Sequence, residues 1–535
     1  MPTRPWPIAT FAALILIAFL APSVLAQEIK AQGTNAQDIK AQDIKPQNTR
    51  ERWYILELAG SPAGHMSSIT TTTGEGDART ITTDASLVLS IARAGAKINV
   101  TQESRFVETA AGKPISMRSR QVMGGEIIQE YVFKEDSVEL TTRQPAGEPK
   151  VSTLKLPEGP WLPPAAAEAY ARQRVAAGAT ELTVRTMDPT LGPTIITAER
   201  KIGAKTTIEI AGRAIAVTEH TVTMSNMPGM KTTEMVDEAG DMVQSRTQLG
   251  GIPIVMTAST RAEALQERAG EMPELMTTTF ITPDKPIKQP RDTIRASYLL
   301  RVKEGQPVDL ATTSAQRVQN VDATTVRVIV DTNALEPAPK QDVENAAFLG
   351  SSAMIEPKDA KIISLAQQAV EQAGVKGRPK AEIAEALRRF AYTYIKKKNL
   401  GVGFASATEV ARSREGDCTE HGVFLASLLR ARGIPSRVVS GLIYADSFAG
   451  SRNIFGYHMW TQALLDIDGE KRWVDLDATL PAAHPTDATH IAVVTSELAD
   501  GELGVSMMPV AQMMGRVDIV VESIEHAGDT KPEPK

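Results

Sequence analysis

Between residues 53 and 259, short apolar and polar runs alternate and are rich in threonine, valine and isoleucine. An alternation with a period of two indicates strands that bury one face, and turn signals such as 237–240 separate the runs. We expect an antiparallel meander forming a large curved sheet or half-barrel, with one helix at about 164–177. The clearest strand-like runs are 53–58, 127–133, 214–223 and 252–257.

The pattern changes after 283–290, a proline-rich segment that we interpret as a hinge. Two strand-like runs, 296–302 and 325–330, predict a small β subdomain. Apolar residues then recur every three or four positions in 362–370 and 383–395, which predicts two amphipathic helices. A third, short helix is expected from Ser406, because Glu409 can complete a capping box with it.

These patterns predict an α+β multidomain fold. A β-rich domain is expected at 51–282, a small β subdomain at 291–340, and an α+β domain at 355–500. A C-terminal strand and a disordered tail are expected at 501–535.

The first 50 residues indicate export. Arg4, an apolar run at 8–20 and the small residues Val24 and Ala26 have the pattern of a signal peptide at 1–26. An uncleaved membrane anchor is the alternative, because the apolar stretch approaches the length of a spanning helix. Residues 27–50 repeat a polar motif and predict a disordered tether. We therefore expect a periplasmic or secreted protein with no membrane span after signal cleavage.

Composition argues against nucleic-acid binding and leaves one cysteine to explain. The chain has 58 Lys and Arg residues against 64 Asp and Glu, so its net charge is −6 and no basic excess is available for nucleic acid. The chain has one cysteine, Cys418, which cannot form an intramolecular disulfide in an oxidising compartment. This residue is therefore either a buried structural thiol or a reactive one.

The neighbours of Cys418 favour a reactive thiol. Asp417 is suited to be the N-cap of a helix that Gly433 ends, and Cys418 then lies in the first turn. Free backbone N–H groups and the helix dipole favour a thiolate at that position, and the backbone N–H of Cys418 can bind an oxyanion. His421 shares a helix face with the thiol, but it also aligns with apolar residues, which favours a buried structural role.

Two strands follow that can supply a base and a carboxylate. Asp468-Gly469 is a hairpin turn signal between 457–467 and 472–479. The resulting register places His458 and Asp477 diagonally on one face, whereas Asp475 lies one pair further away. Asp475 becomes the orienting carboxylate only if the hairpin contains a bulge. A thiol, an imidazole and a carboxylate together support covalent acyl transfer.

At these residues the sequence resembles the transglutaminase-like superfamily, which has a papain-like fold and a Cys-His-Asp triad. The resemblance covers roughly 358–500 and rests on four successive motifs. It implies that Cys418 is the nucleophile, His458 the general base and acid, and Asp477 the orienter; the upstream side chain that donates to the oxyanion is not identified. The motifs are Gly416-Asp-Cys418, Gly433-Ile-Pro-Ser-Arg437, His458-Met-Trp460 and Trp473-Val-Asp-Leu-Asp477-Ala-Thr479.

Other polar residues receive structural interpretations. Asp417, His421, Trp460 and Asp475 are supporting candidates around the triad. His484, Asp487 and His490 could suggest a metal site, but a proline follows His484 and further ligands are missing, so we interpret the segment as a loop with capping side chains. We expect neither metal nor cofactor. His65 and His220 are expected to be ordinary strand residues, and the β-rich domain is expected to contribute no catalytic group.

The predicted function is an exported, thiol-dependent acyl-transfer enzyme, most plainly a cysteine peptidase or amidase that acts on peptides or proteins through a thioester on Cys418. Two alternatives remain open: a transamidating enzyme that cross-links glutamine to amines, and a catalytically inactive peptide-binding protein.

Overall fold

A computed structural model describes residues 48–529, apart from short gaps at 94, 124, 144–148, 190–191, 228–229, 250–251, 267–271, 304–306, 308, 402–403 and 501–508. The predicted signal peptide and most of the predicted tether lie outside the described residues. The last residues assigned to the tether belong to the first strand, which begins at Asn48. Within the described part of the chain, no helix combines the length and apolar character needed to cross a membrane.

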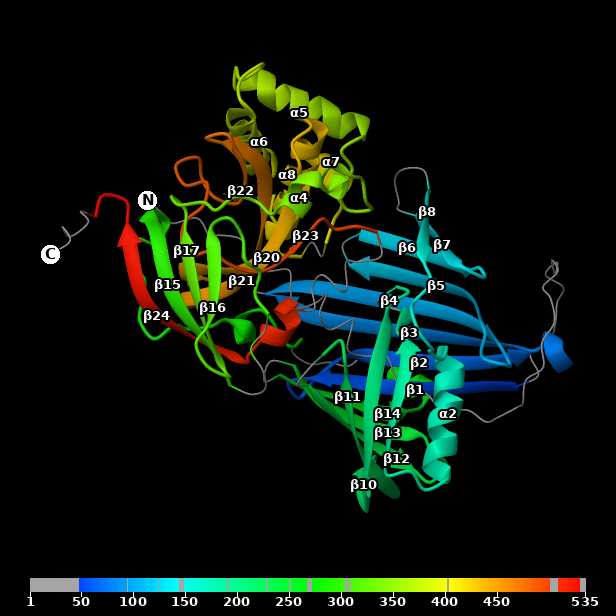
Figure 1. Ribbon diagram of the computed structural model, residues 1–535. Coiled ribbons are helices and arrows are strands. Elements are labelled where there is room, and N and C mark those ends of the chain that lie inside the picture. Colours follow the sequence, from blue (N-terminus) through cyan, green and yellow to red (C-terminus); the bar gives the residue numbers. More distant parts are fainter. Residues whose placement is uncertain are drawn as a thin grey trace.

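The N-terminal half forms one antiparallel sheet of 14 strands (Figure 1). Its first meander contains β1 (Asn48–Leu58), β2 (Ser61–Thr73), β3 (Thr80–Arg93), β4 (Ala96–Thr109), β5 (Pro114–Met123), β6 (Gly125–Phe133), β7 (Ser137–Arg143) and β8 (Lys150–Lys155). Its second contains β9 (Glu181–Met187), β10 (Ile195–Ile210), β11 (Arg213–Met224), β12 (Lys231–Asp237), β13 (Met242–Leu249) and β14 (Ile252–Ser259).

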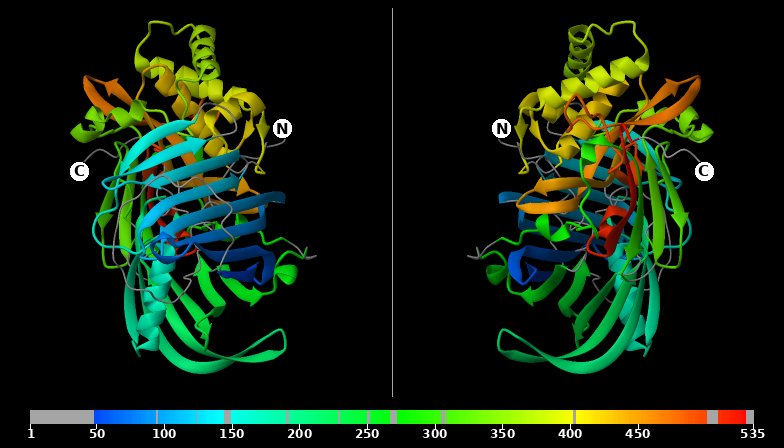
Figure 2. Two further views of the ribbon diagram at one scale, coloured as in Figure 1. Left: turned by 90° about the vertical axis from the view of Figure 1, so that its right-hand side faces the viewer. Right: turned by 90° about the vertical axis from the view of Figure 1, so that its left-hand side faces the viewer.

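Pairing of β1 with β14 joins the two meanders into a single sheet. The sheet is strongly curved, as the side views show (Figure 2). The helix α2 (Pro164–Ala176) connects β8 to β9, close to the predicted range. Glu108 of β4 accepts hydrogen bonds from the backbone N–H groups of Ala165 and Ala166, which satisfies free donors at the start of α2. The prediction of a large curved antiparallel sheet with one helix is therefore confirmed.

A second, four-stranded sheet combines distant parts of the chain. It contains β15 (Thr293–Val302), β16 (Gln316–Asn320), β17 (Thr325–Asp331) and the C-terminal β24 (Val517–His526), which pairs with β15. The predicted small β subdomain therefore includes the predicted C-terminal strand. Short helices also occur at α3 (Arg261–Ala264) and α4 (Lys340–Glu344).

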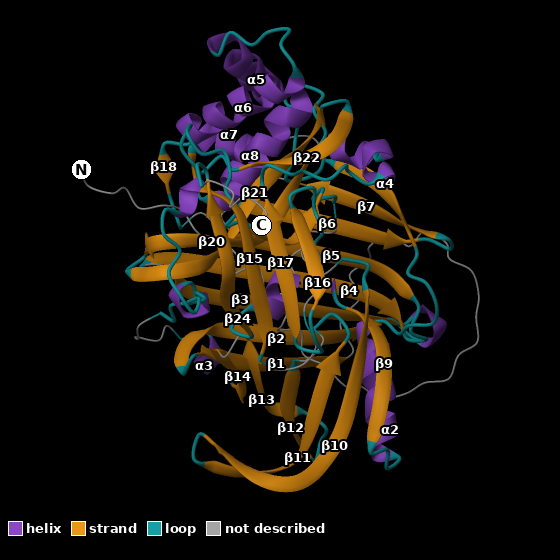
Figure 3. Ribbon diagram, turned by 60° about the vertical axis from the view of Figure 1, so that its left-hand side comes forward, coloured by secondary structure: helices purple, strands orange, loops and turns teal. Residues whose placement is uncertain are grey.

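The remaining helices gather at one end of the molecule (Figure 3). They are α5 (Ala360–Gln372), α6 (Lys380–Tyr394), α7 (Ala407–Ser413) and α8 (Cys418–Ala431). α8 contacts the sheet formed by β20 (Ser436–Phe448), β21 (Ser451–Ile467), β22 (Glu470–Leu476) and β23 (Ile491–Ser496). A two-stranded parallel pair, β18 (Lys397–Lys398) and β19 (Glu415–Gly416), precedes α8. The predicted capping box of Ser406 and Glu409 is present at α7.

The segment after β20 differs from the prediction. We expected a loop up to Gly456. Instead β20 continues to Phe448, β21 begins at Ser451, and the two strands form a tight hairpin. Ala449 and Gly450 both have positive φ angles, 48° and 82°, which match the twist of the flanking strands. Alanine adopts a positive φ less readily than aspartate does, so Ala-Gly is a weaker turn signal than Asp-Gly.

The proline-rich segment is packed, although we expected a hinge. The backbone N–H of Ile287 donates to the Tyr444 hydroxyl at 3.0 Å, and Arg291 forms an ion pair with the buried Asp487. One hydrophobic core extends from the large sheet through the small sheet to β20 and β21, and Cys418 belongs to it. Proline fixes the backbone and removes a donor, which suits a packed irregular segment as well as a linker. The large sheet is therefore not separated from the rest of the molecule.

Candidate active site

The position of Cys418 follows from the start of α8. Asp417 is the N-cap, and its Oδ1 accepts a hydrogen bond from the Thr419 backbone N–H at 3.0 Å. Glu420 accepts one from the Asp417 backbone N–H at 2.8 Å, which completes a capping box. Gly433 has the expected positive φ, 67°, beyond the end of the helix. Cys418 is thus the first residue of the helix, and its side chain is fully buried.

The large sheet reaches this helix end. Arg93, in β3, forms an ion pair with Asp417, and both side chains are completely buried. Burial and the negative charge of Asp417 raise the pKa of Glu420 well above its ordinary value. The Arg93 guanidinium balances the charge of the Asp417 carboxylate, which directly precedes Cys418. We expected no catalytic group from the β-rich domain, and Arg93 is a structural contact; nothing in the local sequence around Arg93 indicates it.

The β21–β22 hairpin has the predicted turn and register. Asp468 and Gly469 have positive φ angles, Ile467 pairs with Glu470, and the ladder continues to the pair Thr461 and Leu476. Asp477 is the first residue after this ladder, and its Oδ2 lies 2.8 Å from His458 Nε2. The other carboxylate oxygen, Oδ1, accepts hydrogen bonds from the backbone N–H and the hydroxyl of Thr479, both at 2.7 Å. Both oxygens of Asp477 are therefore fixed.

His458 lies between this carboxylate and the thiol. Burial alone would lower the pKa of His458, but the charge and hydrogen bond of Asp477, with a further contribution from Cys418, raise it to about 9. The second ring nitrogen, Nδ1, is buried and forms no hydrogen bond within the described residues. With its proton on Nε2 the ring donates to Asp477, which leaves Nδ1 to exchange a proton with the thiol.

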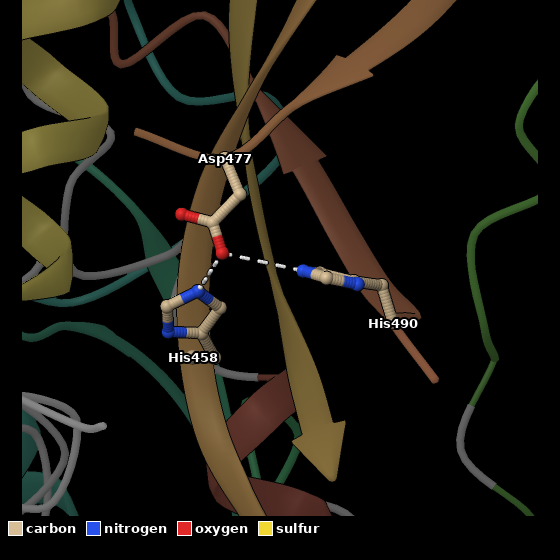
Figure 4. Close-up of side chains that lie close together, drawn as sticks. All are labelled: His458, Asp477 and His490. Carbon is tan, nitrogen blue, oxygen red and sulfur yellow. Dashed lines mark hydrogen bonds and ion pairs between the residues drawn. The ribbon is translucent and has the colours of Figure 1, made fainter. Parts of the chain in front are cut away.

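A second histidine contacts the same carboxylate (Figure 4). His490 Nε2 lies 3.3 Å from Asp477 Oδ2, and His490 Nδ1 lies 3.0 Å from the backbone oxygen of Asp487. Burial lowers the pKa of His490, but the negative charge of Asp487 and the hydrogen bonds to Asp477 and Asp487 raise it to about 9. His490 is therefore cationic at neutral pH and stabilises the Asp477 carboxylate.

The sequence interpretation of 484–490 is partly confirmed. Asp487 caps the local turn by accepting a hydrogen bond from the Thr489 backbone N–H at 2.8 Å. His484 contacts the Arg291 backbone oxygen rather than Asp487 or His490. The role of His490 was not predicted. This residue directly precedes β23, which lies near His458 because Gly441 of β20 pairs with His458 of β21 on one side and with Ala492 of β23 on the other. A short-range sequence pattern contains no signal for that approach.

His458, Asp477 and His490 also form the one set of three candidate metal ligands found within the described residues, with ligand atoms within 4.8 Å of one another. Two imidazoles and one carboxylate are ligand types that zinc accepts. Each imidazole already hydrogen-bonds to Asp477, so a metal ion here would replace these hydrogen bonds.

The supporting candidates have distinct partners. Asp475 accepts hydrogen bonds from Trp460 Nε1 at 2.6 Å and from Gln462 Nε2 at 2.8 Å. Among the described residues it forms no hydrogen bond with His458. Trp460 stacks near the His458 ring, with 6.1 Å between the ring centroids. Asp475 therefore positions the indole beside His458, whereas Asp477 contacts the imidazole directly.

His421 is occupied on both ring nitrogens. Nδ1 contacts the Asp417 backbone oxygen, and Nε2 contacts the Lys398 ammonium. Burial and the positive charge of Lys398 lower the pKa of His421 to about 3, so the ring stays neutral. Lys398 was not identified from the sequence. Its ammonium is withdrawn from water against His421, which lowers the pKa of Lys398 to about 8, while the negative charge of Asp477 partly opposes this shift.

Comparison with known proteins places this site in a family. The profile of the transglutaminase-like superfamily matches residues 364–478, which include Cys418, His458 and Asp477. The comparison with curated proteins found no match.

Three crystal structures show distant similarity. A β-barrel-like domain of unknown function from Brucella abortus is 12% identical, with a TM-score of 0.29 over 39% of this chain and 95% of its own. A candidate cysteine protease from Cytophaga hutchinsonii is 16% identical, with a TM-score of 0.25 over 45% and 89%. A candidate protease from Parabacteroides distasonis is 13% identical, with a TM-score of 0.20 over 72% and 68%. The family match alone identifies residues 364–478 of this chain as a transglutaminase-like domain.

Proposed function

We propose that this protein is an exported, thiol-dependent acyl-transfer enzyme that cleaves amide bonds of peptides or proteins. The observation that carries the proposal is the arrangement of three buried groups: Cys418 at the start of α8, His458 beside it, and Asp477 bonded to the far nitrogen of the same imidazole. A thiol with a purely structural role does not require a neighbouring imidazole that a carboxylate orients.

The chemistry proceeds in two steps. The sulfur of Cys418 attacks the amide carbonyl carbon while the proton of the Cys418–His458 pair is on the imidazole, and a tetrahedral intermediate forms. When the C–N bond breaks, the proton passes from His458 to the leaving amine and an acyl thioester remains on Cys418. Water then gives a proton to His458 and attacks the thioester, which releases a carboxylic acid and restores the thiol.

Charge in the site matches these steps. Asp477 and His458 carry opposite charges when the imidazole is protonated, and His490 stabilises the carboxylate through the same oxygen, Oδ2. The positive end of α8 and the backbone N–H of Cys418 can stabilise the developing oxyanion. We assign the upstream oxyanion donor to Lys398, whose ammonium contacts His421 and interacts electrostatically with Asp477.

The thiol, imidazole and carboxylate are each no more than 1% exposed. A peptide therefore reaches Cys418 only when a covering segment moves, and labelling of the thiol should be slower than its chemistry alone would allow.

The test is covalent trapping followed by product analysis. The full protein is incubated with a panel of short peptides that carry fluorogenic amides, with and without an added primary amine. Mass spectrometry should detect the acyl group on Cys418, and the Cys418→Ala and Cys418→Ser variants should lose it while keeping their circular dichroism spectra. Acid as the main product supports a hydrolase, whereas an amine adduct indicates a transamidase. A panel without any acyl-enzyme and peptide binding that persists in Cys418→Ala would instead indicate a peptide-binding protein.

A further inference from the structure

The curved sheet and α2 enclose an apolar cavity of about 190 Å³, remote in sequence from Cys418. Side chains from β2, β3 and β4 form one wall, side chains from β9 to β14 form the other, and α2 covers the gap between them. Figure 1 shows α2 beside these strands. Most of the lining is aliphatic, aromatic or methionine; representative residues are Met66, Leu87, Phe106, Ile196, Met224 and Met256.

A second hollow, of about 1330 Å³, continues from the cavity along the same face of the sheet. On β2, Met66 and Ser68 line the cavity and Thr70 and Thr72 line the hollow. Successive even-numbered residues of a strand share one face, so the two spaces are consecutive sections of one trough. β3 and β11 repeat this succession.

The two sections meet at two buried polar contacts. Arg52 lines the hollow, and it donates to Glu168 of α2, which lines the cavity, at 2.9 Å. Arg200 of the cavity wall likewise contacts His220 of the hollow at 2.9 Å. The cavity lining itself includes Asp188, Glu168 and the Arg200–Glu234 ion pair; Glu168 and Arg200 contact residues of the hollow, and most of the remaining lining is apolar.

Five cationic side chains line the hollow together with two carboxylates; they are Arg50, Arg52, Arg79, Arg172 and Lys205, with Asp237 and Glu238. Arg50, Arg52 and Arg172 share the carboxylates of Asp241 and Glu168. Burial raises the pKa of Glu168 to about 8 against the lowering effect of these arginines, so much of its negative charge is absent near neutral pH.

Arg79 and Lys205 also line this hollow, and neither forms an ion pair with a described carboxylate. The Nε atoms of Arg79 and Arg172 are buried without a hydrogen-bond partner among the described residues, whereas Nε of Arg52 lies 3.4 Å from Asp241 Oδ1. Buried donors without acceptors are costly, and two of them beside one hollow indicate an anion that interacts with these arginines.

We propose that the trough binds a monoacyl lipid with an anionic head, whose acyl chain occupies the apolar cavity and whose head contacts the arginines of the hollow. This binding is independent of the acyl-transfer chemistry at Cys418. The chain contributes affinity through burial of its methylene groups, and the anion contributes through charge-assisted hydrogen bonds.

The test uses the full protein and palmitate, followed by calorimetry and native mass spectrometry. Affinity should rise about fourfold for each methylene added between octanoate and laurate, because each buried methylene adds a constant transfer free energy. The uncharged 1-palmitoylglycerol should bind about tenfold more weakly than palmitate. Inorganic phosphate alone should bind weakly or not at all. Binding that does not depend on chain length would overturn the proposal.

Matched variants locate the site. Arg79→Ala should weaken palmitate binding about tenfold, whereas Arg143→Ala, which removes an exposed arginine outside the trough, should leave it unchanged. Ala171→Trp fills the cavity from α2 and should abolish binding of both palmitate and 1-palmitoylglycerol. A photoreactive palmitate should label peptides of β2, β3 or α2. Labelling confined to other segments, or full binding by a folded Ala171→Trp variant, would refute the assignment.

Discussion

Arg93, the last residue of β3, forms an ion pair with Asp417, and neither side chain is exposed to solvent. The two residues are 324 positions apart, and Asp417 caps the helix that begins with Cys418. Because a buried charge is costly when it loses its partner, the large sheet and the α8 helix depend on each other. The N-terminal half is therefore part of the structure that holds the candidate nucleophile.

We predict that Arg93→Met lowers the free energy of unfolding by about 3–5 kcal/mol, because it leaves the Asp417 carboxylate buried without its cation. Arg105→Met is the control: it breaks an exposed ion pair with Asp84 on the same sheet and should cost no more than about 1 kcal/mol. Urea denaturation measures both. Combining Arg93→Met with Asp417→Asn should restore part of the loss. Equal costs for Arg93→Met and Arg105→Met would show that the pair does not couple the two regions.

We predict that Asp477→Asn lowers kcat about 10³–10⁴-fold, because an amide no longer holds the His458 tautomer. Asp475→Asn should lower kcat less than about tenfold, because Asp475 bonds Trp460 and Gln462 and acts through the indole. Adding His458→Gln to Asp477→Asn should cause little further loss, since the groups act as one unit. The rate of acyl transfer to Cys418 in a single turnover provides the measurement. An active Asp477→Asn with an inactive Asp475→Asn would exchange the two roles.

Two features of the candidate site could be predicted from the sequence. The contact of His458 with Asp477 follows from local information, because the Asp468-Gly469 turn sets the register of one hairpin and so determines which side chains share a face. The first turn of α8 was equally accessible, since its capping residues lie next to Cys418. In both cases a few neighbouring residues determine the geometry.

Contacts between distant segments were not accessible. His490 approaches Asp477 through the pairing of β23 with β20, and Arg93 reaches Asp417 from another sheet. A single sequence contains no periodic signal for either contact. The segment 283–290 illustrates a further limit, because prolines are equally compatible with a linker and with the packed segment that the structure contains.

The raised pKa values of His458 and His490 predict how stability depends on pH. Each value is about 9 in the folded protein and about 6.5 when unfolded, so each histidine stabilises the fold fully below pH 6.5. That stabilisation is lost as the pH rises to about 9, and it is at most about 3 kcal/mol per group. Urea denaturation at several pH values should show the decline. In His490→Gln the decline should be smaller, whereas His484→Gln, which lies outside this hydrogen-bonded chain, should behave as wild type. An unchanged decline in His490→Gln would contradict the assignment of a cationic His490.

Two neighbouring lysines provide the sharpest test of the proposed oxyanion donor. Lys398 contacts His421 beside the site, whereas Lys397 forms an exposed ion pair with Glu415. If the Lys398 ammonium stabilises the tetrahedral intermediate, Lys398→Met should lower kcat about 10²-fold or more with little change in KM, because the interaction forms mainly in the transition state. Lys397→Met should leave both constants nearly unchanged.

The pH dependence separates this role from a structural one. With the Lys398 pKa at about 8, activity of the wild type should begin to fall near pH 8, before His458 loses its proton near pH 9. Lys398→Arg keeps its charge at all these pH values and should move the decline upward toward pH 9 if it retains activity. A Lys398→Met variant with normal kcat and an unchanged pH profile would exclude Lys398 as the donor. Loss of activity together with a reduced free energy of unfolding would instead assign Lys398 to holding His421 in place.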